Sequence, residues 1–253
     1  MRTPRSTDPA LARIGLLVPS SNTTVEAEFY RALPPSVTLH TARLYLTEIT
    51  PEAILDMVRD MEQQARLLAS ADVDVIVLGA TAPSFLKGLG YDRELALKIE
   101  KATGKRATTT STALLEALAR LGVKRVALAS AYDDKVAAIA RSFLEANGFT
   151  VVAAQGLGLV DNLAVGRLSS DTACELGRKV DRPDAEAIVL ACTNWKTMDV
   201  IERLERELGK PVVSTTQASI WAALRIIGSV PGVPGHGRLL RVIAEEGRAK
   251  QPA

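Results

Sequence analysis

One of the two cysteines in the sequence stands where a buried strand would end. Residues 188–190 form an apolar run of strand type, and Ala191 and Cys192 follow it before small and polar residues. Open α/β sheets place ligands and chemistry at the carboxyl ends of their strands. A thiol there can act as an acid or a nucleophile, and backbone N–H groups at a helix start would lower its pKa. The alternative is a buried structural cysteine, because cysteine is among the most buried residue types.

A second segment has the same pattern but no thiol. Residues 76–78 are followed by Gly79 and Ala80, so that Ala80 stands where Cys192 stands. A hydroxyl-rich segment follows each of the two, at residues 106–113 and 211–218. The apolar strand predicted at 13–18 has a counterpart at 124–130. These matches predict an internal duplication of strand–helix units, and therefore an α/β fold with two parallel sheets.

Two such halves would face each other across a shared cleft, which is a common place for small-molecule sites. We expect pseudo-symmetric, flavodoxin-like or Rossmann-like halves, with the active site between them. The first half is predicted to comprise residues 1–112 and 216–253, with a C-terminal helix that returns to it, and the second half residues 113–215. Apolar periodicity predicts helices at residues 25–33, 51–70, 94–103, 114–121 and 220–226, and Pro83 predicts a loop after the strand at 73–78.

Other residues offer weaker signals. The corner at residues 19–24 could present backbone N–H groups to a carboxylate, although Ser and Thr are also ordinary helix caps. Tyr132 ends a predicted strand and could direct its hydroxyl into the cleft, or it could be a surface tyrosine. Cys174 lies in a helix-like stretch, where we interpret it as a packing residue. His40 and His236 have no cysteine or carboxylate at ligand spacing, which disfavours a histidine-based metal site.

The composition excludes several classes of function. Lys+Arg 31 against Asp+Glu 29 leaves a net charge of +2, which argues against nucleic acid as the main partner. Apolar runs are too short for a membrane span, and residues 1–9 lack the apolar core of a signal peptide. Two cysteines provide no disulfide framework, so we expect a reducing, cytoplasmic location. The phosphate-binding glycine motifs of nucleotide-binding proteins are also absent.

Several segments resemble the aspartate/glutamate racemase superfamily. Within it, residues 18–24 and 161–165 resemble maleate cis-trans isomerases. Other segments resemble arylmalonate decarboxylases more closely, namely residues 79–85, 109–113, 126–132 and 234–240. The resemblance spans nearly the whole chain and implies the fold of that superfamily.

The resemblance also implies a reaction. Racemases and isomerases of the superfamily use two cysteines, one from each half, and in the isomerases the first adds to the alkene. Ala80 occupies that position here and can neither add to a double bond nor accept a proton. The decarboxylases resemble this chain in having a small residue there and only the second cysteine. They imply decarboxylation of a substituted (aryl)malonate without cofactor or metal, in which Cys192 protonates an enediolate on one face.

The same resemblance assigns the remaining site residues. It implies hydrogen-bond donors from Thr81, Tyr132 and the backbone around Ala82, Cys192 and Thr193. Asn22 and Asn162 match isomerase positions that bind substrate carboxylates. Ala82 stands where those decarboxylases carry a hydroxyl, and together with Asn22 it extends the expected substrates to smaller or more polar diacids.

Two alternatives stay open. A maleate isomerase or related racemase would require another nucleophile in place of Ala80, or a natural cysteine at that position. A non-catalytic dicarboxylate-binding protein would use the same cleft without turnover. In each case the partner is a small dicarboxylate, and a homo-oligomer is compatible with the sequence.

Overall fold

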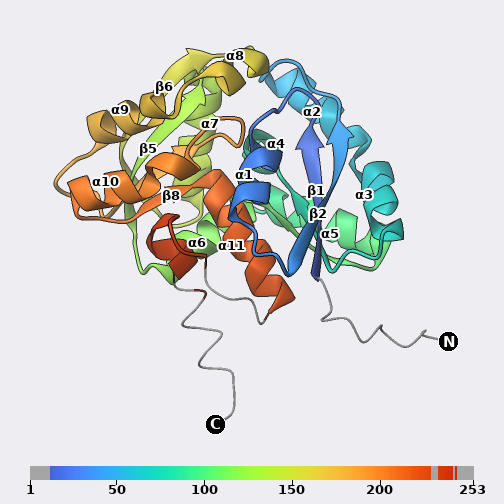
Figure 1. Cartoon of the computed structure of the whole chain (residues 1–253). Coiled ribbons are helices and arrows are strands. Elements are labelled where there is room, and N and C mark those ends of the chain that lie inside the picture. Colours follow the sequence, from blue (N-terminus) through green and yellow to red (C-terminus); the bar gives the residue numbers. More distant parts are fainter. Residues whose placement is uncertain (1–11, 229–232, 242, 244–253) are drawn as a thin grey trace, which may run out of the picture.

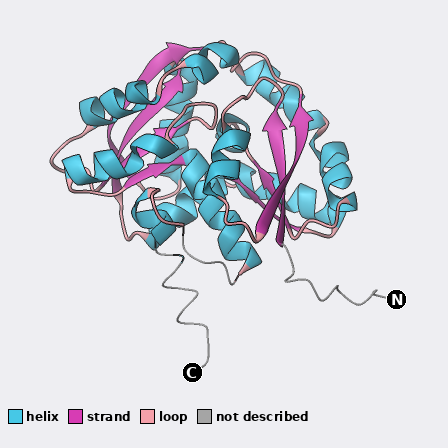
Figure 2. Ribbon diagram, in the orientation of Figure 1, coloured by secondary structure: helices cyan, strands magenta, loops and turns pink. Residues whose placement is uncertain are grey.

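The computed structural model describes residues 12–228, 233–241 and 243. It contains two four-stranded parallel sheets with helices packed on their faces (Figures 1 and 2). This arrangement confirms the predicted α/β class. The N-terminal segment 1–9 lies outside the described residues, as do residues 229–232, 242 and 244–253 of the predicted segment 216–253.

The first sheet has the strand order β2-β1-β3-β4. Its central strands are almost fully buried, because helices cover both faces. The strands are β1 (Ala12–Pro19), β2 (Val37–Leu44), β3 (Val75–Leu78) and β4 (Arg106–Thr109). The helices of this half are α1 (Val25–Ala32), α2 (Pro51–Arg59), α3 (Met61–Ser70), α4 (Thr81–Phe85) and α5 (Tyr91–Thr103).

The second sheet, β6-β5-β7-β8, repeats that order position by position and confirms the predicted duplication. Its strands are β5 (Arg125–Tyr132), β6 (Thr150–Leu159), β7 (Ala187–Ala191) and β8 (Val212–Ser214). Around it lie α7 (Asp134–Ala146), α8 (Asn162–Arg167), α9 (Ser170–Val180), the short 3₁₀ helix η1 (Met198–Val200) and α10 (Ile201–Leu208).

Helices α6 (Thr110–Arg120) and α11 (Thr215–Ile227) pack against each other between the two halves (Figure 1). The hydroxyl-rich segments begin these helices, since Thr109 and Ser214 cap them with their side chains. Ser219 Oγ on α11 donates a hydrogen bond of 3.0 Å to Thr110 Oγ1 on α6. α11 also contacts β3 and β4 of the first sheet. The exact domain boundaries at 112 and 215 stay a prediction.

Four of the predicted elements differ most from the structure. The helix predicted at 51–70 is two helices, α2 and α3, which meet at Asp60, while the apolar stripe runs on across the break. The residues around Pro83 form the helix α4 rather than a loop, because proline is tolerated in the first turn of a helix. α6 and α11 begin four and five residues before the predicted starts at 114 and 220, at hydroxyl residues that resemble a strand end.

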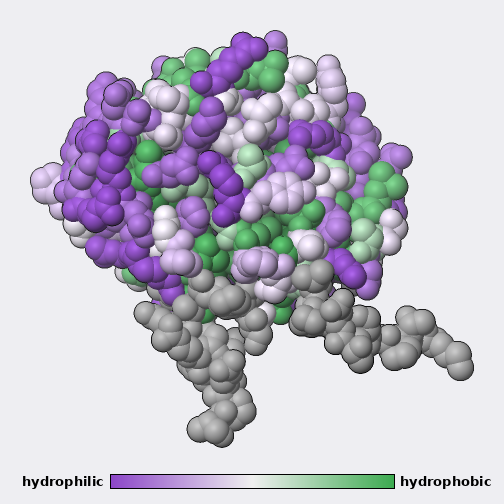
Figure 3. Space-filling model, viewed as in Figure 1, coloured by the Kyte–Doolittle hydropathy of each residue, from purple (hydrophilic) through white to green (hydrophobic). Residues whose placement is uncertain are grey.

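Hydrophilic residues gather on the outer surface over α9 and α10 (Figure 3). Ion pairs of 2.8 Å tie these helices together there, between Arg178 and Glu207 and between Arg203 and Asp171. Pairs this exposed contribute little to stability. Among the described residues, every helix is too short or too polar to cross a bilayer.

Candidate active site

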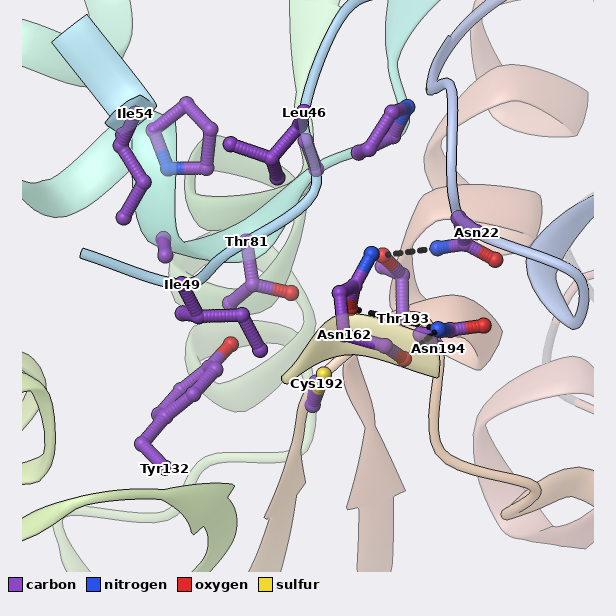
Figure 4. Close-up of a pocket in the computed structure, with 14 residues that line it drawn as sticks. Asn22, Leu46, Ile49, Ile54, Thr81, Tyr132, Asn162, Cys192, Thr193 and Asn194 are labelled. Carbon is purple, nitrogen blue, oxygen red and sulfur yellow. Dashed lines mark hydrogen bonds between the residues drawn. The ribbon is translucent and has the colours of Figure 1, made fainter. Parts of the chain in front are cut away.

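A pocket lies between the two halves, where the four central strands end. Pro19 ends β1, Ala80 follows β3, Tyr132 ends β5 and Cys192 follows β7. All seven predicted site residues line it (Figure 4), although their roles stay predictions. The complete lining is Pro19, Asn22, Leu46, Ile49, Ile54, Ala80, Thr81, Ala82, Pro83, Tyr132, Asn162, Cys192, Thr193 and Asn194.

Cys192 occupies this pocket in a strained backbone conformation. The strand β7 before it is fully buried, and Cys192 itself is 5% exposed, with a φ of 152°. A residue with a side chain rarely adopts such a φ, and the strain persists only where neighbouring contacts hold it. One contact is the Cys192 N–H, which donates to Thr215 Oγ1 at 3.2 Å. That N–H, predicted as a donor to substrate, is therefore already bonded within the protein.

The thiol of Cys192 is a protonated acid at neutral pH. Burial raises its pKa to about 11. Hydrogen bonds from the backbone N–H groups of Asn194 and Trp195 and from the Tyr132 hydroxyl lower the pKa, but by less than burial raises it. The prediction of a lowered pKa is therefore wrong. The expected helix start is displaced, because η1 begins only at Met198 and the sulfur faces a loop. Desolvation then outweighs the backbone dipoles.

Tyr132 places a second protonated donor beside the thiol. Its side chain is 1% exposed, and its ring packs edge-on against Phe85 with centroids 6.0 Å apart. Burial raises its pKa well above the ordinary value, as does the neighbouring Cys192, while the Thr81 hydroxyl lowers it. Thr81 is the first residue of α4, directly after Ala80. The hydroxyls of Tyr132 and Thr81 and the Cys192 thiol thus line one part of the pocket (Figure 4).

The amide of Asn22 has a fixed orientation. Its Oδ1 accepts the N–H groups of Thr24 and Val25 at 2.9 and 3.0 Å, at the start of α1. Its Nδ2 donates to Thr193 Oγ1 in the other half at 3.2 Å. Because an amide nitrogen carries two protons, one N–H remains for a ligand. Asn22 therefore faces the pocket as a donor.

Asn162 is oriented in the same way from the second half. Its Oδ1 accepts from Asn194 Nδ2 at 3.2 Å, and its Nδ2 donates to Ser21 Oγ at 2.8 Å. The second proton on Nδ2 again remains for a ligand. The two amides, one from each half, lie on the same side of the pocket (Figure 4).

Asn194 is a pocket residue that the sequence-based site omitted. Its Oδ1 accepts the N–H of Thr23 at 2.9 Å, and its Nδ2 donates to the Asn162 carbonyl at 2.6 Å. With Asn22, it uses the N–H groups of Thr23, Thr24 and Val25, which favours the helix-cap alternative over an anion site at residues 19–24. In the sequence, the signal that could have identified Asn194 is its position two residues after Cys192.

The opposite wall of the pocket is apolar and was also missed. Leu46, Ile49 and Ile54 form it (Figure 4), and all three come from the segment between β2 and the first turns of α2. Ile49 N donates to the carbonyl of Val160 at 2.8 Å, which draws this segment of the first half onto the second. Only the folded chain brings these residues to the pocket.

The pocket is neutral and small. Among the described residues, no charged side chain lines it, so a bound carboxylate would meet only neutral donors. The space in it that is free for a water-sized sphere is about 20 Å³. The part of the chain that the structure describes holds no cluster of three His, Cys, Asp or Glu side chains suited to a metal. Cys174 is buried outside this pocket, where its Sγ accepts from Arg203 Nε at 3.2 Å.

Comparison with known proteins matches the chain to two related enzyme groups. The chain is 35% identical over 229 residues to the arylmalonate decarboxylase of Bordetella bronchiseptica, covering 89% of this chain and 95% of that protein. Its structure is similar to that of Nocardia farcinica maleate cis-trans isomerase bound to TRIS, with a TM-score of 0.88 and 30% identity, covering 92% of this chain and 99% of that one. A double mutant of arylmalonate decarboxylase in the liganded form has a TM-score of 0.86 and 34% identity, covering 90% and 98% of the two chains.

The match to a family model covers most of the chain. The model is that of arylmalonate decarboxylase, and it matches residues 14–240, which include all but the first two residues of the sheets and every residue of the pocket. The duplicated fold, the pocket between the halves and this match agree, and the chain belongs to the arylmalonate decarboxylase family.

Proposed function

We propose that this protein is a cofactor-independent decarboxylase of substituted malonates, with Cys192 as its proton donor. The observation that carries the proposal is a thiol and a methyl group at equivalent strand ends, Cys192 after β7 and Ala80 after β3. A reaction that needs one thiol from each half would find only one in this pocket. Decarboxylation needs one proton to replace the departing carboxylate, and one thiol suffices for that.

The proposed reaction breaks one carbon–carbon bond and forms one carbon–hydrogen bond. One carboxylate leaves as CO2, and the electron pair of the broken bond stays on the substrate as an enediolate. Cys192 then transfers the proton on Sγ to the α-carbon, and the resulting thiolate takes a proton from water. A thiol with a pKa of about 11 supports this sequence, because it is protonated before the reaction and regains its proton readily at neutral pH.

Neutral donors would stabilise the enediolate. The hydroxyls of Tyr132 and Thr81 lie beside the thiol, and preorganised donors at developing oxyanions contribute on the order of 3–4 kcal/mol each. The free N–H groups of Asn22 and Asn162 would hold the carboxylate that remains. Hydrogen bonds to protein groups fix both amides in place, so they need little reorganisation when a substrate binds.

The apolar wall supports decarboxylation for a separate reason. A carboxylate placed against Leu46, Ile49 and Ile54 would lose its hydration without gaining a partner, which is costly. Loss of CO2 converts that charged group into a neutral one and relieves the cost. The division of the pocket into a polar and an apolar side thus fits a substrate with one carboxylate to keep and one to lose.

Maleate isomerisation is the second candidate. It is favoured by the two pocket amides, Asn22 and Asn162, which could each bind one carboxylate of maleate, and by the 30% identity to the N. farcinica isomerase. It requires a nucleophile that adds to the double bond, and the methyl group of Ala80 stands at that position. We therefore place decarboxylation first.

A single NMR screen in deuterated water tests the proposal. Methylphenylmalonate has no α-proton, so decarboxylation would give phenylpropionate with one deuteron at the α-carbon. Methylmalonate tests for smaller substrates, and maleate reports isomerisation as the appearance of fumarate. Conversion of maleate alone would replace decarboxylation with isomerisation. Calorimetric binding of a malonate without conversion of any compound would overturn both in favour of a non-catalytic binder.

A further inference from the structure

Glu28 of α1 is a buried carboxyl group that does not line the pocket. It is 1% exposed, and its Oε1 accepts two backbone N–H groups from the second half, Thr197 at 2.9 Å and Met198 at 3.1 Å. A buried carboxyl group is costly unless it is hydrogen-bonded, so these two bonds offset its cost. They also tie α1 to the segment that follows Cys192.

Cys192 and the five residues after it, 192–197, form the Cys192 loop. It contributes three residues to the pocket, Cys192, Thr193 and Asn194. The strained φ of 152° at Cys192 persists only where surrounding contacts hold it, and the loop has such contacts at both ends. The N–H of Cys192 is fixed by Thr215 Oγ1 at the first end, and the N–H of Thr197 is fixed by Glu28 at the other.

The middle of the loop has anchors in both halves. Trp195 is fully buried, and its Nε1 donates to Thr172 Oγ1 of the second half at 2.8 Å. Asn194 Oδ1 accepts the N–H of Thr23, which lies just before α1. The first half also contacts Thr193, whose Oγ1 accepts from Asn22 Nδ2 and donates to the Gly79 carbonyl. At the far end of the loop, it is the Glu28 side chain that accepts the N–H of Thr197.

We propose that Glu28 is a positioning residue that fixes the Cys192 loop against α1, so that the thiol of one half points into the pocket shared with the other. A glutamine at this position keeps an oxygen that can accept both N–H groups. An alanine leaves the N–H groups of Thr197 and Met198 buried and unpaired, which favours release of the loop. Glu28→Gln therefore tests whether the hydrogen bonds suffice without a titratable group, and Glu28→Ala tests their loss.

Thiol labelling tests this positioning without any substrate. The rates at which iodoacetamide alkylates Cys192 and Cys174 are measured by mass spectrometry in one sample, and Cys174, which is 0% exposed, reports global opening. We expect Glu28→Ala to speed labelling of Cys192 by roughly tenfold, because local opening exposes it, with Cys174 unchanged. Glu28→Gln should label like the unmodified protein. Equal labelling of Cys192 in all three proteins would overturn the proposal.

A kinetic measurement adds a second readout, and it rests on the proposed decarboxylation. Misplacement of a catalytic group by about 1 Å costs about 100-fold in rate, so Glu28→Ala should lower kcat by about that factor with little change in KM. Glu28→Gln should keep most of the kcat of the unmodified protein. If neither the unmodified protein nor the variants decarboxylate a malonate, the proposed function fails. The labelling result still decides the role of Glu28 in that case.

The matched control is Glu205, another buried carboxyl group that accepts backbone N–H groups, those of Val212 and Arg238. It lies outside the pocket, so Glu205→Ala should leave kcat and the labelling of Cys192 unchanged.

Should Glu28→Ala fail to fold, hydrogen exchange on the unmodified protein decides instead. The amides of Thr197 and Met198 should then exchange as slowly as those of β7, and exchange at exposed-loop rates would refute the positioning role.

Discussion

Replacement of Glu28 by glutamine should change how stability depends on pH. Burial raises the pKa of Glu28 from its ordinary value of 4.5 to about 7, although the N–H groups of Met198 and Thr197 and the charge of Arg31 lower it. Arg31 itself pairs with Asp199 at 3.5 Å. Between pH 4.5 and about 7 the unfolded chain loses this proton while the native protein keeps it. Stability contributed by the neutral carboxyl is therefore lost as pH rises through that window.

The magnitude follows from the width of the window. The interval from 4.5 to about 7, at about 1.4 kcal/mol per pH unit, amounts to about 3 kcal/mol. Glutamine cannot titrate, so the free energy of unfolding of the unmodified protein, minus that of Glu28→Gln, should fall by about 3 kcal/mol between pH 4.5 and 8. Groups common to both proteins cancel in this difference.

Urea unfolding at several pH values measures that difference. Trp195 and Trp221 are both fully buried, so their fluorescence reports loss of the native structure. Glu94→Gln is the control, because Glu94 is exposed and paired with Lys98, which lowers its pKa. It should show no such fall. A difference between the unmodified protein and Glu28→Gln that does not vary with pH would refute the inferred neutral carboxyl.

Three substitutions in the pocket extend the proposed mechanism. Tyr132→Phe keeps the ring contact with Phe85 but removes a donor, so kcat for methylphenylmalonate should fall roughly 100-fold in a steady-state assay; an unchanged kcat would exclude the hydroxyl from the oxyanion site. Ala80→Cys places a second thiol at the strand end equivalent to that of Cys192, and chiral chromatography should show racemic phenylpropionate after long incubation; a product of one hand would contradict opposed thiols. Leu46→Asn puts an amide in the apolar wall, which should lower kcat about 10- to 100-fold, and a rate equal to that of the unmodified protein would remove the wall from the mechanism.

Local sequence patterns predict the framework of the fold well. The buried runs of β1, β3 and β7 are short, apolar and bounded by small residues, which are strong local signals. The break between α2 and α3 at Asp60 escaped prediction, because the buried stripe through Met57 and Met61 continues on both sides of it. The early starts of α6 and α11 were missed because Thr110 and Thr215 have side chains that favour strands.

The pocket was predictable only where residues follow strands directly. Tyr132 and Cys192 stand at strand ends, so their convergence follows from the parallel sheet. Leu46 and Ile49 depend instead on how the segment after β2 folds across to Val160, a long-range contact without a local signal. In the sequence, Glu28 is one of the acidic residues that are common near the start of a helix. Only the docking of α1 against the Cys192 loop buries it.

The most direct test of the central claim is CO2 release by Cys192→Ala. The rate of release from methylphenylmalonate is measured beside the circular dichroism spectrum, with Cys174→Ala as the control thiol. If Cys192 alone delivers the proton, Cys192→Ala should lose about 10²- to 10⁴-fold in rate with an unchanged spectrum, and Cys174→Ala should keep full activity. Turnover by Cys192→Ala at the rate of the unmodified protein would contradict the account.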